Sequence, residues 1–463
     1  MLADLYNTTL LCLDKFYTLL WGAPLLILIM GVGLYLTVVL RGIQFRYLAY
    51  ALKLVFTKQQ HKGEKGDISH FESLMTALAA TIGIGNIAGI STAIVAGGMG
   101  ALFWMWVTAI IGMATRFAES ILAVKYRTTD TKGEMCGGPM YFIQYGLGWR
   151  WLSTAFAFCG AIAAFGGGNM LQANSVADVL KETFSIDPLI SGVVIAVLTG
   201  MTILGGIRSI GKVASFLVPM MVLIYISGAG LILLLNFTKI PGVFLTIFES
   251  AFTGQAAVGG FLGSTIVMAI QMGVSRGLMT SEAGLGTASI AAAAAQTDVP
   301  GRQALVSMTG CFLATIVMCT LTGLVLGVTD ILGKTGTDGK LLTGAAMTMA
   351  AFKSVIPWGG YIVTTGLILF AFTTLVGYAY YGEKCCEYLF GEKLVPYYRI
   401  LFTLIVIPGA VLELEIVWKV SDIFNGMMAI PNLIGIMALS KIVIEEKRAF
   451  TKLLRQEAIE ESA

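Results

Sequence analysis

Long apolar stretches recur along the whole chain, and they restrict its fold more than any other feature of the sequence. A helix needs about 20 mainly apolar residues to cross a bilayer, and backbone groups surrounded by lipid must pair within the protein. The sequence therefore predicts an all-α membrane protein with about 11 transmembrane helices. The stretches that we expect to span lie near 16–40, 70–98, 101–125, 150–184, 188–206, 212–236, 258–281, 302–328, 357–382, 396–413 and 416–443.

The composition supports a chain embedded in lipid. Hydrophobic residues make up 57% of it and charged residues only 12%, whereas soluble domains average roughly 25% charged residues. The apolar stretch at 16–40 is too long for a cleavable signal, so we expect it to remain as an anchor. The sequence has no H-E-x-x-H motif or paired aspartates that would indicate a membrane-embedded enzyme. We expect a multi-pass protein of the cell membrane that uses no cofactor and binds no nucleic acid.

Lysine and arginine residues predict the orientation of the chain, because they concentrate in cytoplasmic loops. When the loops between the expected spans are assigned alternately to the two sides, most of the 30 basic residues fall on one side. This distribution predicts an extracellular N-terminus and a cytoplasmic C-terminus. The segment 41–58 mixes basic with aromatic and aliphatic residues, and we expect it to lie along the inner interface.

The expected spans divide into one extra N-terminal helix and two groups of five. Because five is an odd number, the second group would be inverted relative to the first. Each group opens with a glycine-interrupted span, at 83–86 and at 273–277, and paired interruptions of this kind indicate the binding site of a transporter. The predicted units are the extra helix with the interfacial helix (1–58), the first repeat (68–236), the second repeat (241–444) and a cytoplasmic tail (445–463).

Each interruption would free backbone groups at mid-membrane depth, where an unpaired group is costly unless it meets a ligand or water. The half-helix from Asn86 onward would offer amides near Gly85, Asn86 and Ile87 to a carboxylate. The half-helix that ends near 271–273 would offer carbonyls to an ammonium group. One site would then recognise both poles of an amino acid. The candidate substrate-binding residues are Thr81, Gly83, Gly85, Asn86, Ile87, Gly166, Asn169, Gln172, Gln271, Gly273 and Ser275.

Some polar residues in the expected spans have more than one possible role. Asn169 and Gln172 would either line the pocket or hold helices together. Arg116 and Glu119 are three residues apart on one helix face, and we expect them to pair. Farther along, Arg276 and Glu282 follow towards the cytoplasm and could belong to an inner gate.

Several segments resemble a known transporter family. The sequence GGMGALFWMW at 97–106 is long and unusual, and GGPMYFI at 137–143, NMLQANSVAD at 169–178 and the segment 281–305 add to the likeness. Over essentially its whole length the chain resembles the sodium/alanine symporters, also called alanine or glycine:cation symporters, of the amino acid–polyamine–cation transporter superfamily. The resemblance implies a leucine-transporter-type inverted-repeat core with one extra N-terminal helix. It also implies sodium-coupled import of alanine or glycine by alternating access.

The resemblance further implies a sodium site between the first broken helix and the span at 357–382. The matching ligands are the carbonyls of Ala79, Ile82 and Phe370 and the hydroxyls of Thr373 and Thr374, and oxygen ligands suit a hard cation. Alternatively, the two threonines could bond to carbonyls one turn back in their own helix. Proton coupling is the second hypothesis. It requires a buried carboxylate or histidine, and no aspartate lies near the expected site in the first, third or eighth core helix.

Overall fold

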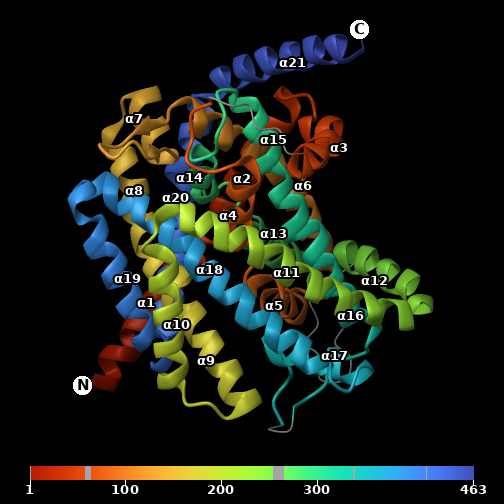
Figure 1. Cartoon of the computed structure of the whole chain (residues 1–463). Helices are drawn as coiled ribbons and strands as arrows, with labels where there is room; N and C mark the ends of the chain where they lie inside the picture. The colour runs from red at the N-terminus through yellow and green to blue at the C-terminus, as the bar shows by residue number, and fades with distance from the viewer. Residues whose placement is uncertain (1, 58–63, 254–264, 337–338, 413, 463) are drawn as a thin grey trace.

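The described part of the chain is almost entirely helical (Figure 1). The computed structural model describes residues 2–57, 64–253, 265–336, 339–412 and 414–462. Residues 258–264 of the predicted span at 258–281 lie outside these ranges, as do residue 413 and the predicted boundary residues 58 and 463. The only sheet within these ranges is a hairpin of β1 (Thr128–Thr129) and β2 (Met135–Cys136). The predicted all-α class is confirmed.

Two consecutive helices form the N-terminal part of the bundle. α1 (Leu2–Leu20) and α2 (Ala23–Val39) are separated by a short turn, and the stretch Thr8–Val39 is long and apolar enough to cross a membrane. The shorter helix α3 (Ile43–Phe56) follows them. α1 and the C-terminal helix α21 (Ser440–Ser462) lie at opposite ends of the bundle (Figure 1).

The first group of core helices begins with an interrupted helix. Its elements are α4 (His70–Thr81), the 3₁₀ turn η1 (Ile84–Asn86), α5 (Ala88–Gly97), α6 (Gly100–Lys125), the hairpin, α7 (Pro139–Leu147), α8 (Arg150–Phe165), the π-helical turn η2 (Gly166–Met170), α9 (Leu171–Phe184), α10 (Pro188–Ile203) and α11 (Gly206–Leu235). α8, η2 and α9 form one continuous stretch, Arg150–Phe184, as predicted for 150–184.

The second group also contains an interrupted helix near its start. Its elements are η3 (Phe237–Lys239), α12 (Ile240–Thr253), α13 (Ile266–Ser281), α14 (Thr287–Ala293), α15 (Pro300–Cys311), the π-helical turn η4 (Phe312–Cys319), α16 (Thr320–Val328), α17 (Gly344–Val355), α18 (Gly359–Phe390), η5 (Glu392–Leu394), α19 (Val395–Val411) and α20 (Glu415–Ala438).

In the part of the chain that the structure describes, only some of the predicted spans coincide with single helical stretches that are long and apolar enough to cross a membrane. Among the described residues, eight helical stretches are long and apolar enough to cross a membrane: Thr8–Val39, Gly100–Lys125, Arg150–Phe184, Gly206–Leu235, Pro300–Val328, Gly359–Phe390, Glu392–Val411 and Glu415–Ala438. The other predicted spans fall on α10 and on the two interrupted helices, whose pieces are shorter. The total of about 11 crossings therefore stays a prediction.

The first interruption lies where the sequence predicts it. α4 begins with a capping box. The Ser69 hydroxyl accepts from the Glu72 amide, and the Glu72 carboxylate accepts from the Ser69 amide. The helix ends at Thr81, and the backbone turns away at Gly83, whose amide donates to Asn86 Oδ1 at 3.1 Å. The Asn86 amide nitrogen Nδ2 donates in turn to the Ala314 carbonyl at 2.8 Å. Asn86 thus satisfies a backbone amide of the interruption and ties the interruption to η4.

The second interruption lies later in the chain than predicted. α13 runs without a break through 273–277 and ends at Ser281, and α14 starts at Thr287. A Cβ on Gly273 would lie 2.5 Å from the Ala101 carbonyl oxygen, so this glycine lets α13 approach α6 closely. The prediction of an interruption at 273–277 was wrong. The observed break at 282–286 contains Gly284 (φ 97°) and Gly286 (φ 84°), both in the left-handed region.

Candidate substrate and ion site

A cavity of about 360 Å³ lies where the two interrupted helices meet α9, α18 and α20. Apolar side chains such as Met279, Leu285 and Trp418 form part of its wall. Its polar and charged lining residues are Thr81, Thr92, Gln172, Arg276, Thr280, Thr374, Tyr378, Ser421, Asp422 and Asn425, and glycines 83, 85, 89 and 167 leave its backbone exposed. The cavity has the mixture expected of a small-molecule site, mostly apolar with a few polar groups.

The cavity brings together part of the predicted site. Thr81, Gly83, Gly85 and Gln172 of the predicted substrate-binding residues line it, and Thr374 of the predicted sodium ligands does so too. These residues come from α4, the first interruption, α9 and α18. The lining does not include Asn86, Ile87, Gly166, Asn169, Gln271, Gly273 and Ser275.

Two predicted residues of the π-helical turn face other helices instead. Asn169 Nδ2 donates to the Phe402 carbonyl of α19 at 2.6 Å, and a Cβ on Gly166 would lie 2.9 Å from Ser421 Cβ of α20. Asn169 thus links the π-helical turn to α19. Gln172, one turn later, lines the cavity, although its amide also donates to a carbonyl of the turn at 2.9 Å.

The sequence suggests free amides at Gly85, Asn86 and Ile87, and of these three only that of Gly85 lacks a carbonyl partner among the described residues. The Asn86 and Ile87 amides donate within the 3₁₀ turn, to the Gly83 and Ile84 carbonyls at 3.1 Å each. Within the described residues, no carbonyl accepts from the amides of Ile84 and Gly85, and both residues line the cavity. The free amides of the first interruption are therefore those of Ile84 and Gly85, which agrees with the prediction at Gly85 and corrects it at Asn86 and Ile87.

The opposite pole lies at the end of α13. Carbonyls at 271–273 belong to a continuous helix, so they are not free for an ammonium group, which corrects the prediction. The Ala283 amide donates to the Ser281 hydroxyl at 3.4 Å, and the Gly284 amide donates to Glu119 Oε1 at 2.9 Å. The carbonyls four residues earlier therefore lack the amides that would continue the helix. Those carbonyls belong to Met279 and Thr280, which line the cavity. The cavity therefore lies between a helix start with free amides and a helix end with free carbonyls.

The residues matched to a sodium site lie at the junction of α4 and α18. Thr374 Oγ1 donates to the Ala79 carbonyl at 3.1 Å, which joins the two helices. Thr373 Oγ1 donates to the Phe370 carbonyl at 3.1 Å in its own helix, as the back-bonding alternative describes. Ile82 follows the end of α4, where its amide donates to the Leu78 carbonyl at 2.7 Å, and it is buried. Buried neutral oxygens of this kind fit a hard monovalent cation.

The comparisons with known proteins agree with this geometry. The family model of the sodium:alanine symporter family matches residues 7–462. The chain belongs to this family. The sodium/alanine symporter AgcS of Methanococcus maripaludis is 54% identical to this symporter over 444 residues, 95% of this chain and 96% of AgcS. The probable sodium/glutamine symporter GlnT of Bacillus subtilis is 36% identical over 436 residues, 94% of this chain and 89% of GlnT.

Family membership settles the broad class. This protein is a cation-coupled amino acid symporter and not an enzyme. The crystal structure of MhsT in complex with L-phenylalanine aligns with a TM-score of 0.57 at 14% identity, covering 84% of this symporter and 99% of MhsT. At this identity the likeness concerns the fold alone. It confirms the leucine-transporter-type core that the sequence predicts.

A buried charge cluster holds the second interruption of the symporter. Arg116 Nη1 lies 4.0 Å from Glu282 Oε2, with both side chains at most 1% exposed. Glu119 Oε1 accepts from the Gly284 amide at 2.9 Å and from Asn432 Nδ2 at 2.7 Å. Arg116 and Glu119 therefore do not pair with each other as predicted. Arg116 instead lies beside Glu282, and Glu119 binds the Gly284 amide, so each contacts the break. Thus α6 supplies Arg116 and Glu119, α20 supplies Asn432, and together these side chains hold the break in place.

Glu282 is the residue near the site that sequence reasoning undervalued. Its Oε2 accepts from the Thr81 hydroxyl at 3.3 Å, so it connects the second interruption directly to the end of α4. A carboxylate in an apolar segment was the available signal, since such residues are costly in lipid and usually functional. Arg276, which was considered with it, instead lines the cavity on α13 near Asp422 of α20.

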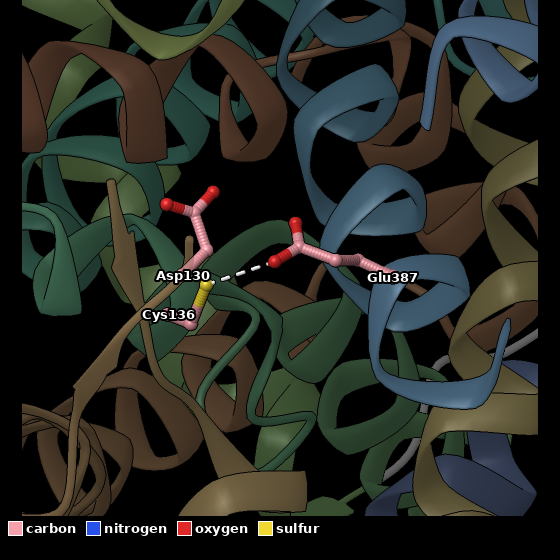
Figure 2. A group of neighbouring side chains, drawn as sticks. All are labelled: Asp130, Cys136 and Glu387. Atoms are coloured by element: carbon pink, nitrogen blue, oxygen red, sulfur yellow. Dashed lines mark hydrogen bonds between the residues drawn. The ribbon is translucent and has the colours of Figure 1, made fainter. Parts of the chain in front are cut away.

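A second cluster of ionisable side chains lies between the β1–β2 hairpin and α18 and does not resemble a metal centre. Figure 2 shows Asp130, Cys136 and Glu387, whose ligand atoms lie within 4.8 Å of one another. Burial raises the pKa of the Cys136 thiol to about 12, and the thiol donates to Glu387 Oε1 at 3.0 Å. The Lys384 ammonium lies 2.9 Å from Glu387 and 3.4 Å from the sulfur, so a cation already occupies this place. The cluster fastens the β1–β2 hairpin to α18.

Proposed function

We propose that this symporter carries a small neutral amino acid, alanine or glycine, together with Na⁺ into the cell across the lipid bilayer by alternating access. The two backbone poles of the cavity carry the proposal. Free amides at Ile84 and Gly85 suit a carboxylate, and free carbonyls at Met279 and Thr280 suit an ammonium group. The name of the relative AgcS, a sodium/alanine symporter, supports the same substrate and ion.

The dimensions of the cavity favour a small side chain. A volume of about 360 Å³ is near the lower end of the range for small-molecule sites. A Cβ on Gly85 would have only Thr280 Cγ2 within 4 Å, at 3.6 Å, and a Cβ on Gly89 would have nothing. The space beside this backbone is therefore open for the substrate, while Met279 and Leu285 bound it with apolar surface.

Uptake by purified protein in liposomes tests the proposal. Labelled alanine should accumulate when an inward sodium gradient is imposed, and it should not accumulate under an equal potassium gradient at the same pH. Unlabelled glycine should compete, because it carries the same two charged groups. Accumulation that ignores the sodium gradient would reject sodium coupling.

Proton coupling remains the second candidate because Glu282 supplies the buried carboxylate that it requires. Glu282 is 1% exposed and is hydrogen-bonded to Thr81, which lines the cavity. In the same liposomes, an inward proton gradient without sodium distinguishes the two ions. Alanine accumulation under that gradient, lost in Glu282→Gln, would assign the coupling to protons.

Replacing Thr374 by Ala should raise the sodium concentration that gives half-maximal uptake. The substitution removes the hydroxyl that lies 3.1 Å from the Ala79 carbonyl, at a cost of about 1–3 kcal/mol. Sodium titration of alanine uptake measures the shift. Thr374→Ser keeps the oxygen and is the control, with a smaller shift expected. An unchanged sodium titration in Thr374→Ala would remove this residue from the proposed ion site.

Replacing Gly85 by Ala should weaken alanine binding while the protein stays folded. The new methyl group would enter open cavity space, so it would displace substrate rather than protein. We expect a loss in affinity of at least about tenfold, or roughly 1.4 kcal/mol, with a smaller loss for glycine. Affinity and melting temperature should be measured on one purified sample. Normal affinity together with a lowered melting temperature would mean that Gly85 serves packing.

A further inference from the structure

The segments that flank the two interrupted helices pair with each other at one end of the bundle. Residues 65–68 precede α4, and residues 294–297 follow α14. The Asp67 amide donates to the Ala294 carbonyl at 2.8 Å, and the Gln296 amide donates to the Ile68 carbonyl at 2.7 Å. A parallel bridge joins Ile68 to Ala295. This backbone ladder ties the start of one interrupted helix to the end of the other.

One side chain spans the whole ladder. Arg127, two residues after the end of α6, directs its guanidinium at four backbone carbonyls. Nη1 donates to Ala293 and Ala295 at 2.9 and 2.7 Å, while Nη2 donates to Lys65 at 2.9 Å and also to Thr297. Three of these carbonyls belong to the end of α14 and the segment after it, where a cation also complements the helix dipole.

The cavity reaches away from this ladder. Its lining includes Thr92 on α5, Arg276 on α13 and Trp418 on α20, but no residue of α14 and none of α4 before Ala80. All seven residues of α14 are buried. The Ser73 hydroxyl on α4 donates to the Ala291 carbonyl of α14 at 2.9 Å. On the side of the ladder, the passage between the two interrupted helices is therefore closed.

We propose that the ladder of 65–68 with 294–297 is the closed inner gate of the symporter and that Arg127 is its latch. The inference rests on the proposed transport function and adds the positioning residue that holds one of its states. In the orientation that the basic residues predict, this end faces the cytoplasm. For α4 and α14 to separate, the guanidinium must release either the Lys65 carbonyl on the α4 side or the three carbonyls at 293, 295 and 297 on the α14 side. Either loss breaks charge-assisted hydrogen bonds that join the two segments.

Arginine is suited to this latch in a way that lysine is not. The planar guanidinium has five donors in a fixed fork, which lets two of its nitrogens serve carbonyls from two segments at once. A lysine ammonium would keep the charge but not this geometry. Arg127→Lys should therefore loosen the gate nearly as much as Arg127→Gln does.

Chemical labelling of a buried reporter tests the latch. In Ser73→Cys the new thiol replaces a hydroxyl that is 1% exposed between α4 and α14. Purified protein in lipid nanodiscs is treated with a polar maleimide, without substrate or sodium, and protein lacking the reporter gives the background from the seven native cysteines. Adding Arg127→Gln should speed labelling at position 73 at least about tenfold.

The matched control is Lys125→Gln in the same background. Lys125 lies two residues away and pairs with Glu446 at the surface, so its loss removes one positive charge but leaves the ladder intact. It should leave the labelling rate unchanged. Equal rates for Arg127→Gln and Lys125→Gln would overturn the latch. A lowered melting temperature with no change in labelling would also overturn it, since that is the signature of a merely structural role.

A cross-link tests the gate without depending on Arg127. In Ile68→Cys/Ala295→Cys the two thiols occupy the partners of the parallel bridge. Oxidation to a disulfide should stop alanine uptake in liposomes, and a reductant should restore it. Normal uptake by the oxidised protein would overturn the gate. If labelling responds to Arg127 as expected but no variant takes up alanine, the proposed substrate fails while the gate stands.

Discussion

Arg116→Gln should destabilise the symporter more than any other single change considered. The substitution would leave two carboxylates, Glu119 and Glu282, buried at 0% and 1% exposure without a cation beside them. Breaking a buried pair by removing one partner costs about 3–5 kcal/mol. We expect a large fall in the melting temperature of the detergent-purified protein, with loss of transport.

Neutralising Glu282 in the same protein tests this prediction. In Arg116→Gln/Glu282→Gln the uncompensated carboxylate at position 282 becomes a neutral amide, so the double variant should recover part of the lost stability. Lys239→Gln is the control, because Lys239 pairs with Asp330 on the exposed surface and such pairs contribute about 0–1 kcal/mol. An Arg116→Gln protein that melts like Lys239→Gln would show that the cluster does not stabilise the fold.

The helical fold could be predicted because the bilayer imposes a strong rule on the sequence. Only continuous apolar stretches of sufficient length span lipid, and the stretch Arg150–Phe184 shows that a span can be recognised even when a π-helical turn lies within it. The interruption at 83–86 was also recognisable. Two glycines with an asparagine inside an apolar span have little other use than to release the helix, and Asn86 then caps it.

The second interruption was misplaced because glycine has two uses in a membrane helix. Gly273 allows α13 to pack against α6, and Gly286 adopts a left-handed backbone at the break. The sequence shows a glycine in both places, but only the neighbouring helix decides which use applies. The carbonyl pole moved with the break, from 271–273 to Met279 and Thr280.

The long-range polar contacts could not be predicted for a related reason. Asn169 and Gln172 are three residues apart on one helical stretch, yet Asn169 bonds to α19 while Gln172 lines the cavity. Which of them faces the cavity depends on the rotation of that helix against α18, α19 and α20. Similarly, the partners of Arg116 lie 165 or more residues away in the chain, at the second break. Such contacts are fixed by helix packing.

The neighbouring glycines at 83 and 85 should give different results when each is replaced by Ala. At Gly85 the methyl group meets open space, whereas at Gly83 it would lie 2.6 Å from Thr374 Oγ1. Gly83 has an extended backbone (φ −121°, ψ −161°) that any residue adopts, so backbone strain does not confuse the result. Gly83→Ala must therefore push Thr374 away from the Ala79 carbonyl, which lies 3.1 Å from its hydroxyl.

Displacing Thr374 should impair the ion site rather than the substrate site. Overpacking a closely packed position costs about 1–3 kcal/mol, so the sodium concentration for half-maximal uptake should rise roughly 5- to 150-fold. Alanine affinity should recover at saturating sodium, unlike in Gly85→Ala. Threonine is stiff about χ1, so Gly83→Ala/Thr374→Ser should regain part of the sodium affinity because serine can turn aside. If Gly83→Ala titrates with sodium like the unmodified protein, the junction of α4 and α18 does not bind the coupling ion.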